Sequence, residues 1–132
     1  MLTIPRHIIN EIIAHAKLEL PNEACGYLAG IGTDVKQAYT LTNIDHSPEH
    51  FSFDPAEQFR TVKAARKAGH EILANFHSHP ESPARPSEED KKLAYDPEIS
   101  YIIVSLASET PDVKSFKIRN GEVEKEEIVV IE

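Results

Sequence analysis

The order of the central elements can be read from ILANFHSHPESPARPSEED, which spans residues 72–90. Its first five residues, Ile72–Phe76, are mostly apolar and predict a short buried strand. That strand carries two histidines, His77 and His79, at its exit. Three prolines, at positions 80, 83 and 86, and a lack of hydrophobic periodicity then predict a loop. A short helix is expected to begin near Ser87.

Upstream of these residues the sequence predicts one helix and two strands. Apolar residues recur at spacings of one, three and four within Pro5–Glu19, which is the period of an amphipathic helix. Cys25–Ala29 and Val35–Thr42 are rich in strand-forming residues. A hairpin through Gly30-Ile31-Gly32 is therefore expected to join them.

A second helix is predicted to follow a short strand at His50–Phe53. The sequence Asp54-Pro55-Ala56-Glu57 combines an N-cap, a proline at the first helical position and a capping-box glutamate. Gly69 suits the C-terminal cap of this helix. The strand at Ile72–Phe76 then starts almost at once.

The C-terminal part of the chain predicts strands only. Ser100–Leu106 and Val113–Ile118 read as strands, and Asn120-Gly121 as a two-residue turn into a last strand at Val123–Ile131. Helices and strands intermix without a regular βαβ rhythm. The sequence therefore predicts an α/β protein of the α+β type, with a mixed β-sheet flanked by helices. A length of 132 residues suits a single domain covering residues 1–132.

Composition excludes several classes of function. A formal net charge of −8, with scattered basic residues, argues against nucleic-acid binding, and no apolar run reaches the roughly 18 residues of a membrane span. The single cysteine, Cys25, and the lack of a signal-peptide pattern favour the cytoplasm. Cys25 sits among apolar and glycine residues without a basic neighbour, which argues against a thiol protease.

A metal site is predicted at the end of the central strand. Side chains two apart in a strand point to the same face, so His77 and His79 can converge on one ion. A carboxylate at Asp90, brought back by the proline-rich loop, completes a set of two histidines and one carboxylate with an open fourth position. Zinc is favoured by the imidazole ligands, although non-haem iron uses the same set.

The same residues carry a resemblance to a known family. His77-Ser78-His79, seven further residues and Ser87-Glu88-Glu89-Asp90 match H-x-H-x7-S-x-x-D, and an upstream glutamate, Glu23, lies in the segment PNEACGYLAG. This pattern resembles the motif of the JAMM, or MPN-plus, metalloproteases. The likeness to small bacterial members extends to Tyr101–Ser105 and the Asn120-Gly121 turn, so it covers most of the chain.

The resemblance implies a fold, a cofactor and a role for each residue. It implies a cytidine-deaminase-like MPN fold in which His77, His79 and Asp90 bind one zinc ion. Glu23 would be the general base that activates zinc-bound water and passes the proton to the leaving amine. Ser87 would donate a hydrogen bond to the carbonyl oxygen, on which charge builds in the transition state.

Two of these residues have simpler readings. Ser87 followed three residues later by Asp90 is also an ordinary helix N-cap, and both roles can coexist. Glu23 has rivals for the role of base in Glu19 and Glu11. Glu23 is preferred because it directly precedes the Cys25–Ala29 strand and matches the family position.

The family implies hydrolysis of a peptide or isopeptide bond after the C-terminal glycine of a ubiquitin-like or sulfur-carrier protein with a C-terminal diglycine. Release of cysteine from a carrier adduct is one form of this reaction. The alternative is a non-catalytic MPN scaffold that binds partners without metal, which predicts lost ligands. A DNA-repair-associated relative is disfavoured because it would carry extra N-terminal helices, and a zinc deaminase because the chain has no Pro-Cys-x-x-Cys segment. The sequence leaves the oligomeric state open.

Overall fold

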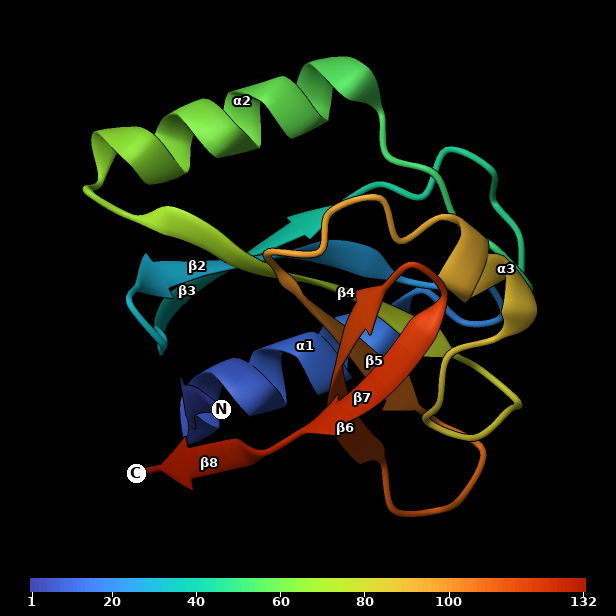
Figure 1. The fold of residues 1–132 in the computed structure, drawn as a ribbon. Coiled ribbons are helices and arrows are strands. Elements are labelled where there is room, and N and C mark those ends of the chain that lie inside the picture. The colour runs from blue at the N-terminus through green and yellow to red at the C-terminus, as the bar shows by residue number, and fades with distance from the viewer.

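The computed structural model describes residues 1–132, and its strands form one eight-stranded mixed sheet in the order β7-β6-β5-β4-β2-β3-β1-β8 (Figure 1). The expected mixed sheet with flanking helices is confirmed. The elements, in chain order, are β1 (Leu2–Pro5), α1 (Arg6–Leu18), β2 (Cys25–Ile31), β3 (Asp34–Leu41), α2 (Pro55–Lys67), β4 (Glu71–His79), α3 (Glu88–Lys92), β5 (Ser100–Ser105), β6 (Asp112–Arg119), β7 (Glu122–Glu126) and β8 (Ile128–Ile131).

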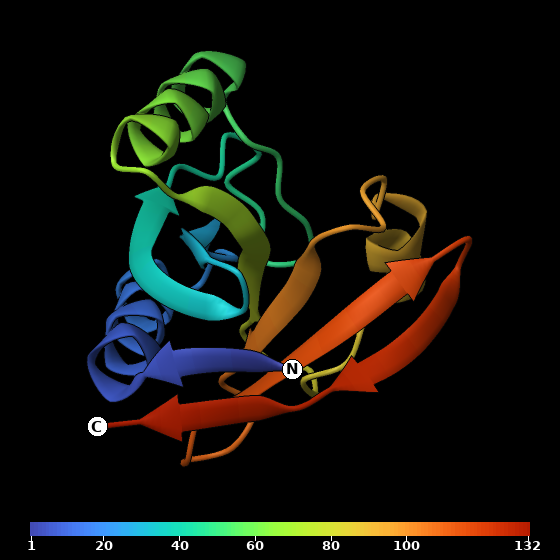
Figure 2. The same cartoon turned by 60° about the vertical axis from the view of Figure 1, so that its left-hand side comes forward.

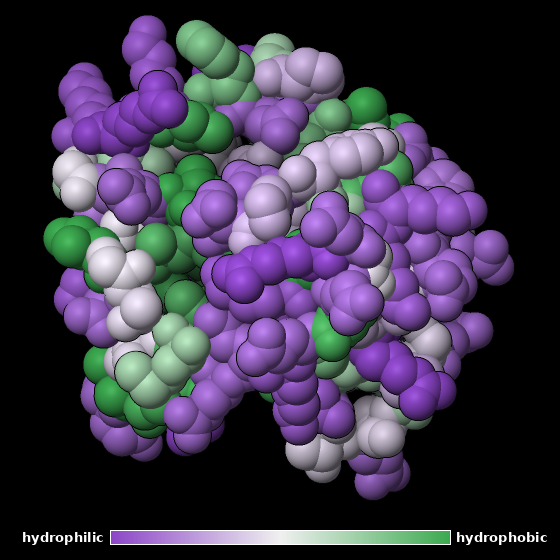
Figure 3. Space-filling view, in the orientation of Figure 1, coloured by the Kyte–Doolittle hydropathy of each residue, from purple (hydrophilic) through white to green (hydrophobic).

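The helices divide between the two faces of the sheet. α1 packs its buried isoleucines, Ile8, Ile9 and Ile12, against one face, where they join a single large hydrophobic cluster. α2 and α3 lie over the opposite face, as Figure 1 shows. Two smaller apolar clusters occupy that second face, one around Tyr27 and one around Tyr101. In the orientation of Figure 1 the surface is mainly hydrophilic, with hydrophobic side chains gathered along its left side (Figure 3).

The sheet is strongly curved, because the chain leaves one edge and joins the other. β7 pairs with β6 antiparallel, and after a break at Glu127 the chain continues as β8, which pairs with β1 in parallel. Figure 2 shows β8 running on from β7 and lying beside β1. A single straight strand cannot pair with both edges of a curved sheet. The prediction of one continuous strand at Val123–Ile131 is therefore wrong. Two short strands, β7 and β8, take its place.

β4 is the strand that positions the site. It pairs with β2 antiparallel and with β5 parallel, in the registers Cys25↔His77 and His77↔Ile103. Side chains alternate along it, so Phe76 enters the α1 cluster while His77 and His79 point to the face of α2 and α3. Gly26 allows this close packing, since a Cβ there would collide with the Phe76 ring.

Most of the predicted elements are confirmed, including the limits of the first helix, the hairpin after Ile31 and the Asn120-Gly121 turn, whose residues both have positive φ. The predicted strand at His50–Phe53 is wrong, because this segment is a loop with one isolated bridge between Asn43 and Phe53. β1 was not predicted. Its four residues are too few to show a period.

The start of α2 also differs in one detail. Asp54 caps the helix by accepting a hydrogen bond from the Ala56 amide, as predicted. Glu57 does not complete a capping box. Its carboxylate accepts hydrogen bonds from the amide and hydroxyl of Thr42 at 2.6 and 3.2 Å, which ties the helix to the end of β3. None of the three helices is both long and apolar enough to cross a bilayer.

Candidate metal centre

Three ligand atoms meet where β4 ends against α3. The Nε2 atoms of His77 and His79 lie 3.2 Å apart, and Oδ2 of Asp90 lies 3.2 and 3.1 Å from them. A tetrahedral ion with bonds of about 2.0 Å separates its ligand atoms by about 3.3 Å. Both imidazoles are buried, and Asp90 is partly buried. The spacing therefore fits a zinc-sized ion.

The hydrogen bonds around His79 strengthen this fit. Nδ1 of His79 lies 2.8 Å from the carbonyl oxygen of Pro83, which can only accept, so Nδ1 carries the proton. In the neutral ring, Nε2 then presents a lone pair to His77 and Asp90. A carbonyl that holds the far nitrogen of a histidine is the usual support of a metal ligand. Three electron-pair donors that face one another repel, and a cation bound between them would remove this repulsion.

Asp90 is held by the first turn of α3. Ser87 is the N-cap: its Oγ accepts from the Asp90 amide at 3.1 Å, and its own amide donates to Oδ2 of Asp90 at 2.9 Å. Burial raises the pKa of Asp90. Without a metal, a proton on Nε2 of His77 or His79 can take the place of the cation, and the resulting hydrogen bonds to Asp90 outweigh burial and hold its pKa well below the ordinary value. The carboxylate is thus ionised and ready to bind a cation.

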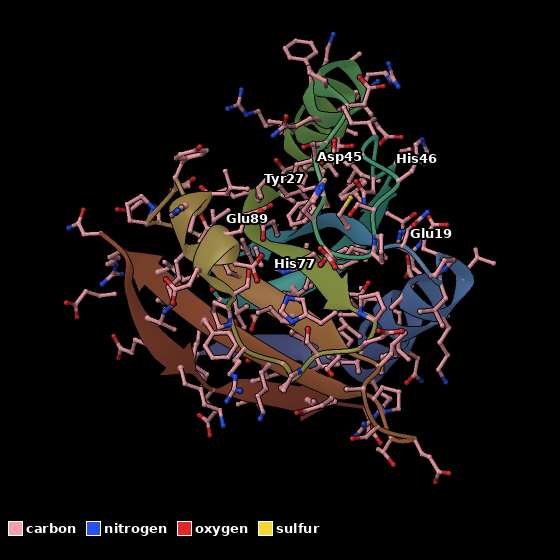
Figure 4. All side chains as sticks on the ribbon, turned by 90° about the vertical axis from the view of Figure 1, so that its right-hand side faces the viewer. Glu19, Tyr27, Asp45, His46, His77 and Glu89 are labelled. Carbon is pink, nitrogen blue, oxygen red and sulfur yellow. The ribbon has the colours of Figure 1, made fainter.

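The imidazole of His77 is fixed by packing. Its ring stacks on Phe51 with centroids 4.8 Å apart and an interplanar angle of 26°, and its buried Nδ1 has no hydrogen-bond partner. Figure 4 shows His77 below Glu89 of α3. The sequence reading missed Phe51, because the segment that carries it was assigned to a strand. For His79, burial lowers the pKa, but Asp90 and the Pro83 carbonyl raise it above its ordinary value overall.

Glu23 lies beside this cluster without a partner of its own. It is 4% exposed, its Oε1 has no hydrogen bond, and it lines the same cleft as His79 and Ser87. Burial raises the pKa of Glu23 to about 8; the nearby His79 lowers it, and Asp90 raises it further. A carboxyl group that gains and loses a proton near neutral pH has the property of a general base.

The rivals of Glu23 lie elsewhere. Glu11 is exposed on α1, and Figure 4 shows Glu19 at the end of α1, apart from His77. Cys25 pairs in register with His77, but its thiol is fully buried and lies 3.9 Å from the Leu41 carbonyl. Burial raises the pKa of Cys25 to about 12, so the thiol stays protonated and is no nucleophile.

Two polar side chains hold the backbone around Glu23. Ser78, between the two histidines, accepts from the Ala24 amide at 2.7 Å through Oγ, and its own amide donates to the Ala24 carbonyl. Asn43 donates through Nδ2 to the carbonyl of Glu23 at 3.1 Å and to that of His50 at 3.0 Å. The sequence had indicated no role for either residue.

Asn43 also shapes the loop that carries Phe51. Its Oδ1 accepts from the amides of Asp45 and Ser52, at 3.0 and 3.2 Å. Asn43 is 4% exposed, so both ends of its amide are satisfied inside the protein. One side chain therefore fixes the position of Glu23 relative to Phe51, and through it to His77. The only signal in the sequence was an asparagine next to a predicted strand end.

This fold, and a buried pair of histidines facing an aspartate and a glutamate, are those of a JAMM-type peptidase. The chain belongs to the family described as prokaryotic homologs of the JAB domain, whose model matches residues 5–119.

Named relatives and solved structures agree with this assignment. The chain is 34% identical to the CysO-cysteine peptidase of Mycobacterium tuberculosis, over 100% of this chain and 92% of that protein. It is 33% identical to a probable TtuB-protein conjugate cleaving protease of Thermus thermophilus, over 92% of this chain and 79% of that one.

The structural likeness is just as broad. The solution structure of a protein from Desulfitobacterium hafniense is similar with a TM-score of 0.92 and 52% identity, covering 100% of this chain and 94% of that one. A structure described as a JAMM metalloprotease-like zinc site in the proteasome and signalosome is similar with a TM-score of 0.65 and 25% identity, covering 100% and 99%.

Replacing Asn43 by alanine is expected to lower the free energy of unfolding by at least about 2 kcal/mol, because buried carbonyl and amide groups lose their partners. Urea unfolding measures the change. Asn10→Ala, at an exposed site on α1, is the matched control and should cost no stability. Equal unfolding curves for the two variants would contradict the role assigned to Asn43.

The buried carboxyl of Glu23 predicts a pH-dependent stability. The unfolded chain ionises at about 4.5 and the folded one at about 8, so the metal-free protein loses stability as the pH rises between these values. Glu23→Gln does not titrate. The free energy of unfolding of Glu23→Gln, minus that of the unsubstituted protein, should therefore increase from pH 5 to pH 8 by on the order of 2–4 kcal/mol and then level off. Thermal unfolding with a chelator, with Glu11→Gln as the control, checks this; an advantage independent of pH would refute it.

Proposed function

We propose that the protein hydrolyses a peptide or isopeptide bond after the C-terminal glycine of a ubiquitin-like or sulfur-carrier protein. His77, His79 and Asp90 bind one zinc ion, Glu23 is the general base and Ser87 stabilises the oxyanion. The observation that carries the proposal is the buried, unpaired carboxyl of Glu23 in the same cleft as the ligand His79. A structural carboxylate would have partners, whereas a base must be free to take a proton.

The residues divide the work of one hydrolysis. Zinc held by His77, His79 and Asp90 would supply Lewis-acid chemistry, which lowers the pKa of water at the site to near neutrality. Glu23 takes a proton from the attacking water, whose oxygen forms the new bond to the carbonyl carbon. As the carbon–nitrogen bond breaks, Glu23 gives this proton to the leaving amine. The carboxylic acid that forms then loses its remaining proton to the amine. The products are the glycine carboxylate and the ammonium form of the amine, so atoms and charges balance.

Ser87 can cap α3 and act on the substrate together. Its Oγ accepts one hydrogen bond in the cap and donates none, so the hydroxyl hydrogen is free for a carbonyl oxygen. A donor placed where charge develops strengthens in the transition state. The cap fixes the position of the oxygen without using its hydrogen, so the two roles are compatible.

The groove beside the ligands suits a narrow tail. It lies between α2 and the segment after α3, has a volume of about 790 Å³, and has a floor of Tyr27, Asn75 and Tyr101, which are aligned across three strands. A smaller pocket shares Asn75 and Tyr101 with it and reaches His77. Two glycines let a substrate backbone approach such a floor closely. The names of the Mycobacterium and Thermus relatives support a carrier conjugate as the substrate.

A non-catalytic scaffold is the weaker alternative. A scaffold has no need for ionisable groups that are costly to bury. This chain keeps the ligand cluster and also buries an unpaired glutamate beside it. The stability lost to that glutamate is explained by catalysis and not by partner binding.

Zinc-loaded protein should cleave a carrier protein joined through Gly-Gly to an amine, as followed by mass spectrometry of the carrier C-terminus. Metal analysis should find close to one zinc per chain, and less in His77→Ala and Asp90→Ala. Glu23→Gln should keep the metal and lose at least about 100-fold in kcat, since it cannot carry the proton. Full activity in the presence of a chelator, or in Glu23→Gln, would falsify the mechanism.

Ser87→Ala should lose about 100-fold or more in kcat with its zinc retained, because an oxyanion donor is gone. It should also lose about 1 kcal/mol of stability with the cap. Asp54→Ala, which removes the cap of α2, is the matched control: it should lose similar stability and keep its activity. If both variants keep kcat, Ser87 is a helix cap and nothing more.

A further inference from the structure

Two separate hollows meet at the ligand cluster. The groove with the Tyr27, Asn75 and Tyr101 floor approaches it through the small pocket that holds His77 and Asp90. A second cleft, of about 570 Å³, approaches it from the other side and holds His79, Glu23 and Ser87. A substrate that crosses the site therefore has one part in each hollow.

The direction of proton transfer decides which hollow holds the carrier tail and which holds the leaving group. Glu23 must reach the nitrogen of the leaving amine, and Glu23 lines the second cleft but neither pocket of the groove. The leaving group consequently occupies the second cleft, and the carrier tail the groove. This step rests on the function proposed above.

The second cleft is acidic. Its lining includes three carboxylates, Glu23, Glu49 and Glu81, and no lysine or arginine. Glu23 is almost fully buried, and its Oε1 has no partner there. Three of its ten lining residues are prolines, Pro21, Pro48 and Pro80, which restrict rearrangement of the backbone. The cleft thus presents the negative charge of two exposed carboxylates, Glu49 and Glu81, to whatever leaves.

We propose that the leaving group is an amine carried by a protein or peptide, with neighbouring positive charge, and not a single amino acid with a free carboxylate. A free amino acid joined through its α-amine places its carboxylate two bonds from the scissile nitrogen. In this cleft that anion faces Glu49 and Glu81, and no lysine or arginine side chain lines the cleft to pair with it. A lysine side chain in a basic segment carries no such anion, and the net charge of −8 attracts it from solution.

The test compares three conjugates of one sulfur-carrier protein that ends in Gly-Gly. The carrier is joined to cysteine, to cysteinamide, or to the side chain of a lysine within an arginine-containing peptide. Zinc-loaded protein should cleave cysteinamide with a kcat/KM about fivefold above that for cysteine, and the basic peptide better still. Salt screens charges, so these ratios should shrink at 1 M ionic strength.

Variants assign the preference to the cleft. The double variant Glu49→Gln, Glu81→Gln should bring the cysteinamide-to-cysteine ratio close to one. Glu11→Gln, which removes one exposed charge on α1, should leave the ratio as it was. Equal cleavage of cysteine and cysteinamide, or a ratio that the double variant does not change, overturns this inference alone. Failure of the folded, zinc-loaded protein to cleave any conjugate overturns the proposed function and this inference with it.

Discussion

Three electron-pair donors, from His77, His79 and Asp90, face one another across about 3 Å at the end of β4. The carbonyl of Pro83 decides the tautomer of His79 and so leaves its Nε2 free to bind a metal ion. Such an arrangement is repulsive without a positive charge at its centre. The proline loop, the cap of α3 and the register of β4 each serve to hold this arrangement together.

The carboxyl group of Glu23 is held in a different way, through its backbone. Glu23 has a fully bonded backbone, tied to Ser47 and Asn43, and a side chain with an unbonded oxygen. Rigid backbone contacts therefore replace the side-chain hydrogen bonds that would otherwise orient the group. The carboxyl group is thus held in position and can still accept a proton. This explains why Asn43, a buried polar residue, bonds to the backbone of Glu23 and not to its side chain.

Sequence alone predicts the parts of this protein that depend on local order. The period of α1, the Asp54 cap and the alternation that turns His77 and His79 to one face all follow from neighbouring residues. The loop of residues 44–52 could not be predicted, because it is shaped by bonds from one side chain, Asn43, to backbone groups up to nine residues away, which no local pattern of residues indicates. The Ser87 cap shows the same limit: the pattern predicted its bond to Asp90, but not that its hydroxyl hydrogen stays free.

The seam between β1 and β8 has a consequence for folding order. It joins Leu2 to Ile128, whereas the residues of the site lie between 23 and 90 on more central strands. Closing so large a loop costs entropy that no nearby contact repays, so this seam should form late and open first. The protein can fray at its edge while the centre of the sheet, and the ligands on it, stay in register.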